Sequence, residues 1–220
     1  MSSLDLDIAH LLAGGLVLAS LLLLYQTRML GLLHMFALHA LILACAVAWQ
    51  AKIQHAPHLY VTAAIALVLK VIVIPAALFQ ILKRLNIHRE VETVGGIGPT
   101  MLAGIGLVAL STVLMLRITP TSGQLAREDL AFALAVILLG LLMMVTRRNA
   151  MSQVIGFMSI ENGLILAATG AQGMPLVVEI SIAFSVLVAL IVVGIFLFRI
   201  RERFDTVDVH ALDRFSGERS

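Results

Sequence analysis

Long runs of apolar residues are the feature that most limits what this chain can fold into. An α-helix needs about 20 apolar residues to cross the hydrocarbon core of a bilayer. Hydrophobic residues make up 60% of the chain and charged residues 13%, against about a quarter in soluble domains. The sequence therefore predicts an all-α, polytopic transmembrane bundle of about seven helices. The expected helices are 8–25, 29–49, 59–82, 94–116, 130–146, 150–170 and 175–199.

Basic residues at the ends of these runs predict the orientation of the chain. Eleven Lys and Arg flank one side of the membrane, including the pair Arg147 and Arg148, and three flank the other. Because cytoplasmic loops are enriched in Lys and Arg, we expect the N-terminus outside and the C-terminus in the cytoplasm. The basic residues are thus accounted for as flanks of membrane helices, and nucleic acid is not an expected partner. The acidic start, MSSLDLDIAH, lacks the basic flank of a cleaved signal peptide.

A weak internal repeat suggests how the single transmembrane domain, 1–220, is organised. LLLLYQTR at 21–28 resembles LLMMVTRR at 141–148, and HALILA at 39–44 resembles NGLILA at 162–167. IALVLKVIVIPAALF at 65–79 resembles IAFSVLVALIVVGIF at 182–196. The matches lie in the same order, although a reduced apolar alphabet also produces such matches by chance. We expect parallel three-helix units at 1–93 and 130–203, a connecting helix within 94–129 and a cytoplasmic tail at 204–220.

Ionisable residues inside the apolar runs are candidates for chemistry, because each costs about 2.5 to 3.5 kcal/mol at the bilayer centre. Lys70, Glu161 and His39 each fall midway along a run and share one level in the membrane. Burial disfavours the charged form of every such group, so neighbouring acids and bases can come close enough in proton affinity to exchange protons. The pattern predicts a proton relay that also includes His34 and Glu179.

Structural roles remain as alternatives for each of these residues. Lys70 and Glu161 would also serve as a static ion pair between helices. His34 and His39 would also serve as ordinary hydrogen-bond donors between helices, and Glu179 is close enough to the surface to snorkel.

Pro75 lies inside the third run and is expected to break its helix. Proline has no N–H, so the carbonyl of Val71 loses its helical donor. That carbonyl is next to Lys70, and an unsatisfied backbone group in a membrane needs water or protein around it. The sequence therefore predicts a hydrated site beside the lysine.

The residues that commonly hold metals are too few for a coordination set. Cys45 is the single cysteine, and His34 and His39 lie about 140° apart on one helix. We expect no catalytic, metal or cofactor site in this chain, and no haem between the two histidines.

Several motifs resemble subunits of known assemblies. TRRN at 146–149, VIGFMSIENGLILA at 154–167 and the tail DTVDVHALDRF at 205–215 resemble the K subunit of respiratory complex I and the C subunit of multisubunit cation/proton antiporters. Over the full length, including LVLKVIVIP at 67–75 and NGLILA after Glu161, the chain resembles component E of hydrogenase-4 and related formate hydrogenlyase complexes.

This resemblance implies a non-catalytic helical subunit in the membrane arm of a complex I-like redox assembly. Its partners would be antiporter-like membrane subunits, the metal redox centres would belong to other subunits, and its role would be proton or sodium translocation or its coupling. The resemblance carries over to Glu161, about one turn beyond the expected place. The position of a later buried glutamate is occupied by Leu187, whose equivalent in the first repeat is Lys70. A purely structural scaffold and a stand-alone small ion transporter remain as alternatives.

Overall fold

The protein is described by a computed structural model that covers residues 3–85, 93, 95–118, 124–170, 187 and 191. Over these residues the chain forms helices, and Thr93 and Arg147 form an isolated bridge. Six helices in these ranges are long and apolar enough to cross a membrane. The all-α membrane bundle expected from the sequence is thus confirmed for six spans. The expected helix at 175–199, apart from Leu187 and Ile191, and the tail lie outside the described residues.

The six spans follow the apolar runs closely, with ends that extend into polar sequence. The third span is continuous but changes its hydrogen-bond pattern twice, because a π-helical segment separates two α-helices. The elements are α1 Ser3–Tyr25, α2 Met29–Gln54, α3 Pro57–Ile65, the π-helix η1 Ala66–Val73, α4 Ile74–Leu85, α5 Ile97–Ile118, α6 Gln124–Thr146 and α7 Ala150–Gly170.

Turn residues mark the helix ends. Arg28 is extended and precedes α2, while His55 ends α2 in the left-handed conformation, at φ 52°, and donates its N–H to a carbonyl in the last turn. Pro57 follows at the start of α3, where its missing N–H has no helical partner to lose. Gly95 and Gly96 both have positive φ, 85° and 86°, a conformation that glycine adopts without steric cost. They set the sharp entry into α5.

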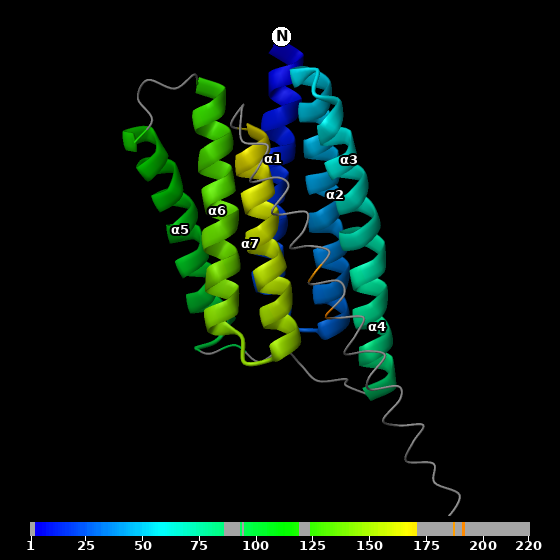
Figure 1. Cartoon of the computed structure of the whole chain (residues 1–220). Helices are drawn as coiled ribbons and strands as arrows, with labels where there is room; N and C mark the ends of the chain where they lie inside the picture. Colours follow the sequence, from blue (N-terminus) through cyan, green and yellow to red (C-terminus); the bar gives the residue numbers. More distant parts are fainter. Residues whose placement is uncertain are drawn as a thin grey trace, which may run out of the picture.

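Four helices form the centre of the bundle and two spans flank it (Figure 1). α1, α2, α6 and α7 pack together around buried apolar side chains. α5 lies against α6 and α1, and the α3–η1–α4 span lies along α2. The buried apolar side chains include Leu16, Leu24, Phe36, Leu43, Leu139, Met143 and Ile155.

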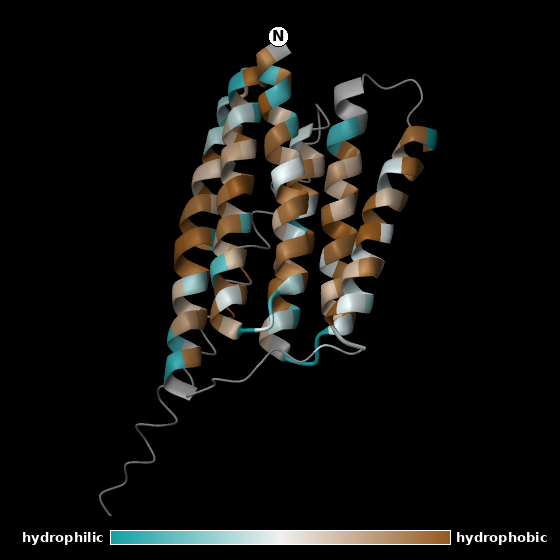
Figure 2. Cartoon of the chain, turned by 180° about the vertical axis from the view of Figure 1, so that it is seen from behind, coloured by the Kyte–Doolittle hydropathy of each residue, from teal (hydrophilic) through white to brown (hydrophobic). Residues whose placement is uncertain are grey.

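The outer faces of the spans are apolar, as lipid contact requires. Leu11 and Leu102 are each 73% exposed and Val145 is 79% exposed, although all three are large hydrophobic side chains. Figure 2 shows hydrophobic residues along the middles of the helices and hydrophilic residues gathered near their ends. This pattern fits a chain that crosses the bilayer several times.

The α6–α7 contact is backbone against backbone. A Cβ atom placed on Gly140 would lie 2.9 Å from the carbonyl oxygen of Gly156 and the nitrogen of Ile160. One placed on Gly163 would lie 3.0 Å from the carbonyl oxygen of Ala133. Small residues at these positions allow the close approach that drives helix association in membranes. The helix that carries Glu161 is therefore held tightly against α6.

Candidate functional site

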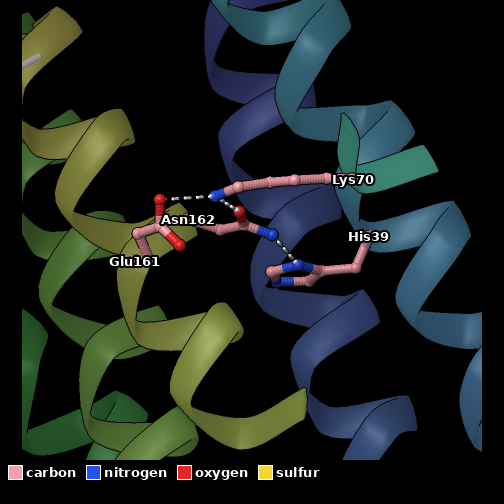
Figure 3. A network of polar contacts seen from close by, with 4 residues as sticks. All are labelled: His39, Lys70, Glu161 and Asn162. Atoms are coloured by element: carbon pink, nitrogen blue, oxygen red, sulfur yellow. Dashed lines mark hydrogen bonds and ion pairs between the residues drawn. The ribbon is translucent and has the colours of Figure 1, made fainter. Parts of the chain in front are cut away.

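Lys70 and Glu161 meet inside the bundle at the level expected from the sequence. Lys70 comes from η1 and Glu161 from α7, and their Nζ and Oε1 atoms are 3.3 Å apart. The lysine side chain is 0% exposed and the glutamate side chain 4% exposed. Figure 3 shows the lysine extended across the bundle toward α7. A buried pair of opposite charges stabilises each ion in the absence of water.

Asn162 links this ion pair to His39. Its Oδ1 atom accepts a hydrogen bond from Lys70 Nζ at 2.6 Å, and its Nδ2 atom lies 2.8 Å from Nδ1 of His39 (Figure 3). On the other edge of the imidazole, Nε2 lies 2.8 Å from Oγ of Ser20. Lys70, His39, Glu161, Asn162 and Ser20 are all buried. We call these five residues the buried network; it joins η1, α7, α2 and α1.

The helix break expected at Pro75 takes a different form. The helix continues through Pro75 into α4, and the departure from α-helical pairing lies before it, in η1. Ile74 N–H bonds to the carbonyl of Leu69, five residues back. The next bond in that register would need an N–H on Pro75 for the carbonyl of Lys70, so proline ends the π-helical pattern there. Without an N–H, Pro75 can donate neither to the carbonyl of Lys70, its partner in the π-helical register, nor to that of Val71, its partner in the α-helical register.

The structure does not bring all the expected relay residues together. His34 is exposed and donates from Nδ1 to the carbonyl of Leu30 in its own helix, at 2.7 Å. It takes no part in the buried network. Glu179 lies outside the described residues. Leu187, at the position of the later glutamate, is 49% exposed.

Sequence reasoning missed Asn162 and Ser20 as members of the site. A signal for Asn162 was present, because it is the first residue of NGLILA and the repeat pairs it with His39 in HALILA. Ser20 is one of the few polar residues within the first apolar run. Its hydroxyl also donates to the carbonyl of Leu16 at 3.0 Å, a bond available to any serine in a helix, so its pattern alone indicates nothing further.

Arg147 is buried at one end of the bundle, in contrast to its expected role as an orienting flank. It is 1% exposed, while Arg148 beside it is exposed. Its guanidinium donates to the carbonyls of Leu24, at 2.6 Å, and Gln26, at 2.9 Å, where α1 ends. Burial lowers the pKa of the Arg147 guanidinium from its ordinary value. The arginine therefore caps the carbonyl end of α1, a site where a cation is favourable.

A second polar group lies at the opposite end of the bundle. Asp129 is buried at 4% exposure, and its Oδ2 atom accepts a hydrogen bond from Gln50 Nε2 at 3.1 Å. His10 Nε2 and Glu128 Oε2 are 3.0 Å apart nearby, and Gln54 donates to the carbonyl of residue 169 at 2.7 Å. These contacts join α1, α2, α6 and α7 near the N-terminal end of α1.

Among residues 3–85, 93, 95–118, 124–170, 187 and 191, no group of three or more His, Cys, Asp or Glu could hold a metal ion. Cys45 is exposed on the bundle.

The fold and the buried network define a class: a multi-pass helical membrane protein with a charged network inside it. The chain is 31% identical to hydrogenase-4 component E of Escherichia coli K12 over 217 residues, which cover 96% of this chain and 98% of that protein. The Shigella flexneri protein of the same name matches equally. An uncharacterized protein of Mycobacterium tuberculosis is 29% identical over 205 residues, covering 91% and 92%. The chain belongs to the hydrogenase-4 component E family. No family profile matches the chain, and no solved structure matches it significantly.

Proposed function

We propose that this chain is a non-catalytic membrane subunit of a hydrogenase-4-type, complex I-like assembly, and that its buried network contributes to proton translocation or its coupling. Membership of the component E family supports the place in such a complex. Its partners would be antiporter-like and other membrane-arm subunits in the cell inner membrane, with the metal redox centres in neighbouring subunits.

The observation that carries the proposal is the buried network itself. A lysine, a glutamate and a histidine, each able to bind and release a proton, are connected through 2.6, 2.8 and 3.3 Å contacts inside a helical bundle. Ionisable residues inside membrane segments are expensive and mark ion pathways and proton relays. Lys70 and Glu161 are close enough to exchange a proton directly, and Asn162 connects Lys70 to His39 through hydrogen bonds.

The network favours protons over sodium as the translocated ion. Sodium binding requires several oxygen ligands with little positive charge nearby. Here the Lys70 ammonium already occupies Oδ1 of Asn162 and faces Oε1 of Glu161. An ammonium can hand on a proton, but it repels a metal cation.

The main alternative is that Lys70 and Glu161 only hold helices together. In that case, removing one partner leaves the other buried and unpaired, at a cost of about 3 to 5 kcal/mol. The amount of assembled complex should then fall in Lys70→Met and in Glu161→Gln. Replacing both residues by apolar ones should be milder than replacing either.

Measuring complex yield and protons translocated per turnover, in Lys70→Met, Glu161→Gln and the double variant, distinguishes the two roles. We expect near-normal assembly and reduced translocation in both single variants, with no rescue in the double variant. Lys52→Met is the matched control, because Lys52 is exposed and lies over the Trp49 ring, outside the network. Full translocation in both single variants would refute the relay. Transport by the purified chain alone would instead favour a stand-alone transporter.

A further inference from the structure

Asn162 lies between two titratable groups, Lys70 and His39, and its contacts assign which end of its amide is the oxygen and which the nitrogen. Lys70 Nζ can only donate when it is an ammonium, so the atom that faces it, at 2.6 Å, is the amide oxygen. The amino group of Asn162 therefore faces Nδ1 of His39, at 2.8 Å. An amide nitrogen only donates, so Nδ1 must be unprotonated in order to accept.

The same reasoning fixes the rest of the chain of hydrogen bonds. A neutral imidazole without a proton on Nδ1 carries one on Nε2, which donates to Ser20 Oγ at 2.8 Å. The Ser20 hydroxyl then donates to the carbonyl of Leu16 at 3.0 Å. Each residue from Lys70 to Ser20 thus donates to the next one, and the series ends at the carbonyl of Leu16. The positive charge of Lys70 sets this order, because an ammonium can only donate.

We propose that Asn162 is a positioning residue that makes the protonation of Lys70 and His39 mutually exclusive. A doubly protonated His39 presents an N–H at Nδ1, which needs the amide oxygen of Asn162. The amide must then turn over, and its amino group faces Lys70. Lys70 accepts that hydrogen bond only as a neutral amine. This inference deepens the proposed function, on which its relevance rests.

The exchange balances without a further reactant except water. Lys70 Nζ passes a proton to Glu161 Oε1, 3.3 Å away, and leaves an amine and a carboxylic acid. The amide of Asn162 turns, and Nδ1 of His39 takes a proton that arrives from the aqueous phase as hydronium, which leaves a water molecule behind. Within the described residues, the neighbouring helices bring no other charged group to this level of the bundle. Residues 11–24 of α1, 130–146 of α6 and the rest of α7 contain none. The remaining histidine inside α2, His34, is exposed and bonded to its own helix.

Nitrogen-15 NMR of the full chain in lipid nanodiscs, labelled at histidine, tests this directly. The His39 signals are assigned by their loss in His39→Gln. From about pH 5 to 8, where an ordinary histidine titrates, we expect Nδ1 of His39 to remain unprotonated and Nε2 to remain protonated. In Lys70→Met, the Nδ1 signal should shift to its protonated position in part of the population. Lys70→Arg should match the unmodified chain, because a guanidinium only donates.

Asn162→Leu separates the amide from the charge of the lysine. If the amide sets the direction, removing it while Lys70 remains should allow the Nδ1-protonated form of His39 to appear. Lys52→Met, outside the network, should change neither signal. An imidazolium at His39 beside a charged Lys70 in the unmodified chain, or unchanged spectra in both Asn162→Leu and Lys70→Met, would overturn the proposal. The spectra do not depend on pumping, so this inference and the proposed relay fail separately.

Discussion

Nδ2 of Asn162 and Nδ1 of His39 are 2.8 Å apart, and the two residues begin the hexapeptides NGLILA and HALILA. α2 and α7, which carry them, run in the same direction through the bundle (Figure 1). Parallel repeats related by an axis along the membrane normal place equivalent residues at one depth. The contact is therefore what the proposed duplication would produce, with the histidine of one unit facing the asparagine of the other.

The two histidines of α2 should differ in their effect on proton translocation. His39→Gln removes a titratable group that lies between Ser20 and Asn162, whereas His34→Gln changes an exposed side chain bonded to its own helix. We expect reduced translocation per turnover with near-normal assembly for His39→Gln, and no change for His34→Gln. Proton uptake by membrane vesicles that contain the complex measures both. A loss in His34→Gln would place the path along the exposed side of α2.

Adding a methyl group at the α6–α7 contact should destabilise the bundle. Gly163→Ala would bring a Cβ atom to 2.7 Å from Cγ1 of Ile137 and to 3.0 Å from the carbonyl oxygen of Ala133, and the second contact is with backbone, which a change of rotamer cannot relieve. Such overpacking costs about 1 to 3 kcal/mol. Gly106→Ala is the control, since nothing lies within 4 Å of its added Cβ. Thermal unfolding in detergent compares the two, and equal midpoints would show that the helices separate easily.

The neighbouring arginines at the end of α6 should differ in their contribution to stability. Arg147→Met removes a buried cation that satisfies carbonyls at the end of α1, and hydrogen bonds to charged groups contribute about 1.5 to 3 kcal/mol. Arg148→Met removes an exposed side chain and should change unfolding little. The yield of folded protein in membranes checks both variants. A larger loss for Arg148→Met would mean that charge in the loop matters more than the cap.

The basic flanks predict seven crossings with the C-terminus in the cytoplasm. Reporter fusions at Ser220 should give a cytoplasmic signal, and fusions in the loop at 172–173 a periplasmic one. A periplasmic signal at Ser220 would show an even number of crossings, or an inverted bundle.

The purified chain should retain no iron, nickel, zinc or haem. Its single cysteine is exposed, and His39 already uses both ring nitrogens in contacts to Ser20 and Asn162. Elemental analysis after purification in mild detergent, before and after chelator treatment, measures this. A stoichiometric metal lost together with helical structure would show that metal binding has a structural role.

Hydropathy located the six described spans because lipid solubility depends on the average of many residues. It placed the start of α6 at 130, whereas the helix begins at Gln124. The polar start of α6 includes Asp129, which is buried beside Gln50 of α2. A hydropathy average cannot show that a polar residue has a hydrogen-bond partner on another helix.

The charged members of the site were predictable because a buried charge is costly wherever it occurs. Asn162 and Ser20 were not, since a neutral amide or hydroxyl in an apolar run costs far less and does not stand out from other polar residues. The π-helical register of η1 was also missed. An α-helix and a π-helix differ in whether each N–H bonds to the carbonyl four or five residues back. The apolar sequence before Pro75 is compatible with both.

The seam of glycines between α6 and α7 decides which parts of the site have freedom to move. With backbone atoms 2.9 to 3.1 Å from the Cβ positions of Gly140, Gly156 and Gly163, neither helix can roll about its axis without driving a side chain into its neighbour. The backbone that carries Glu161 and Asn162 is therefore fixed against α6, although the Asn162 amide can still turn about its side-chain bonds. A change in the distance between this backbone and that of Lys70 must come from displacement of the α3–η1–α4 span, which carries the lysine on the flank of the bundle.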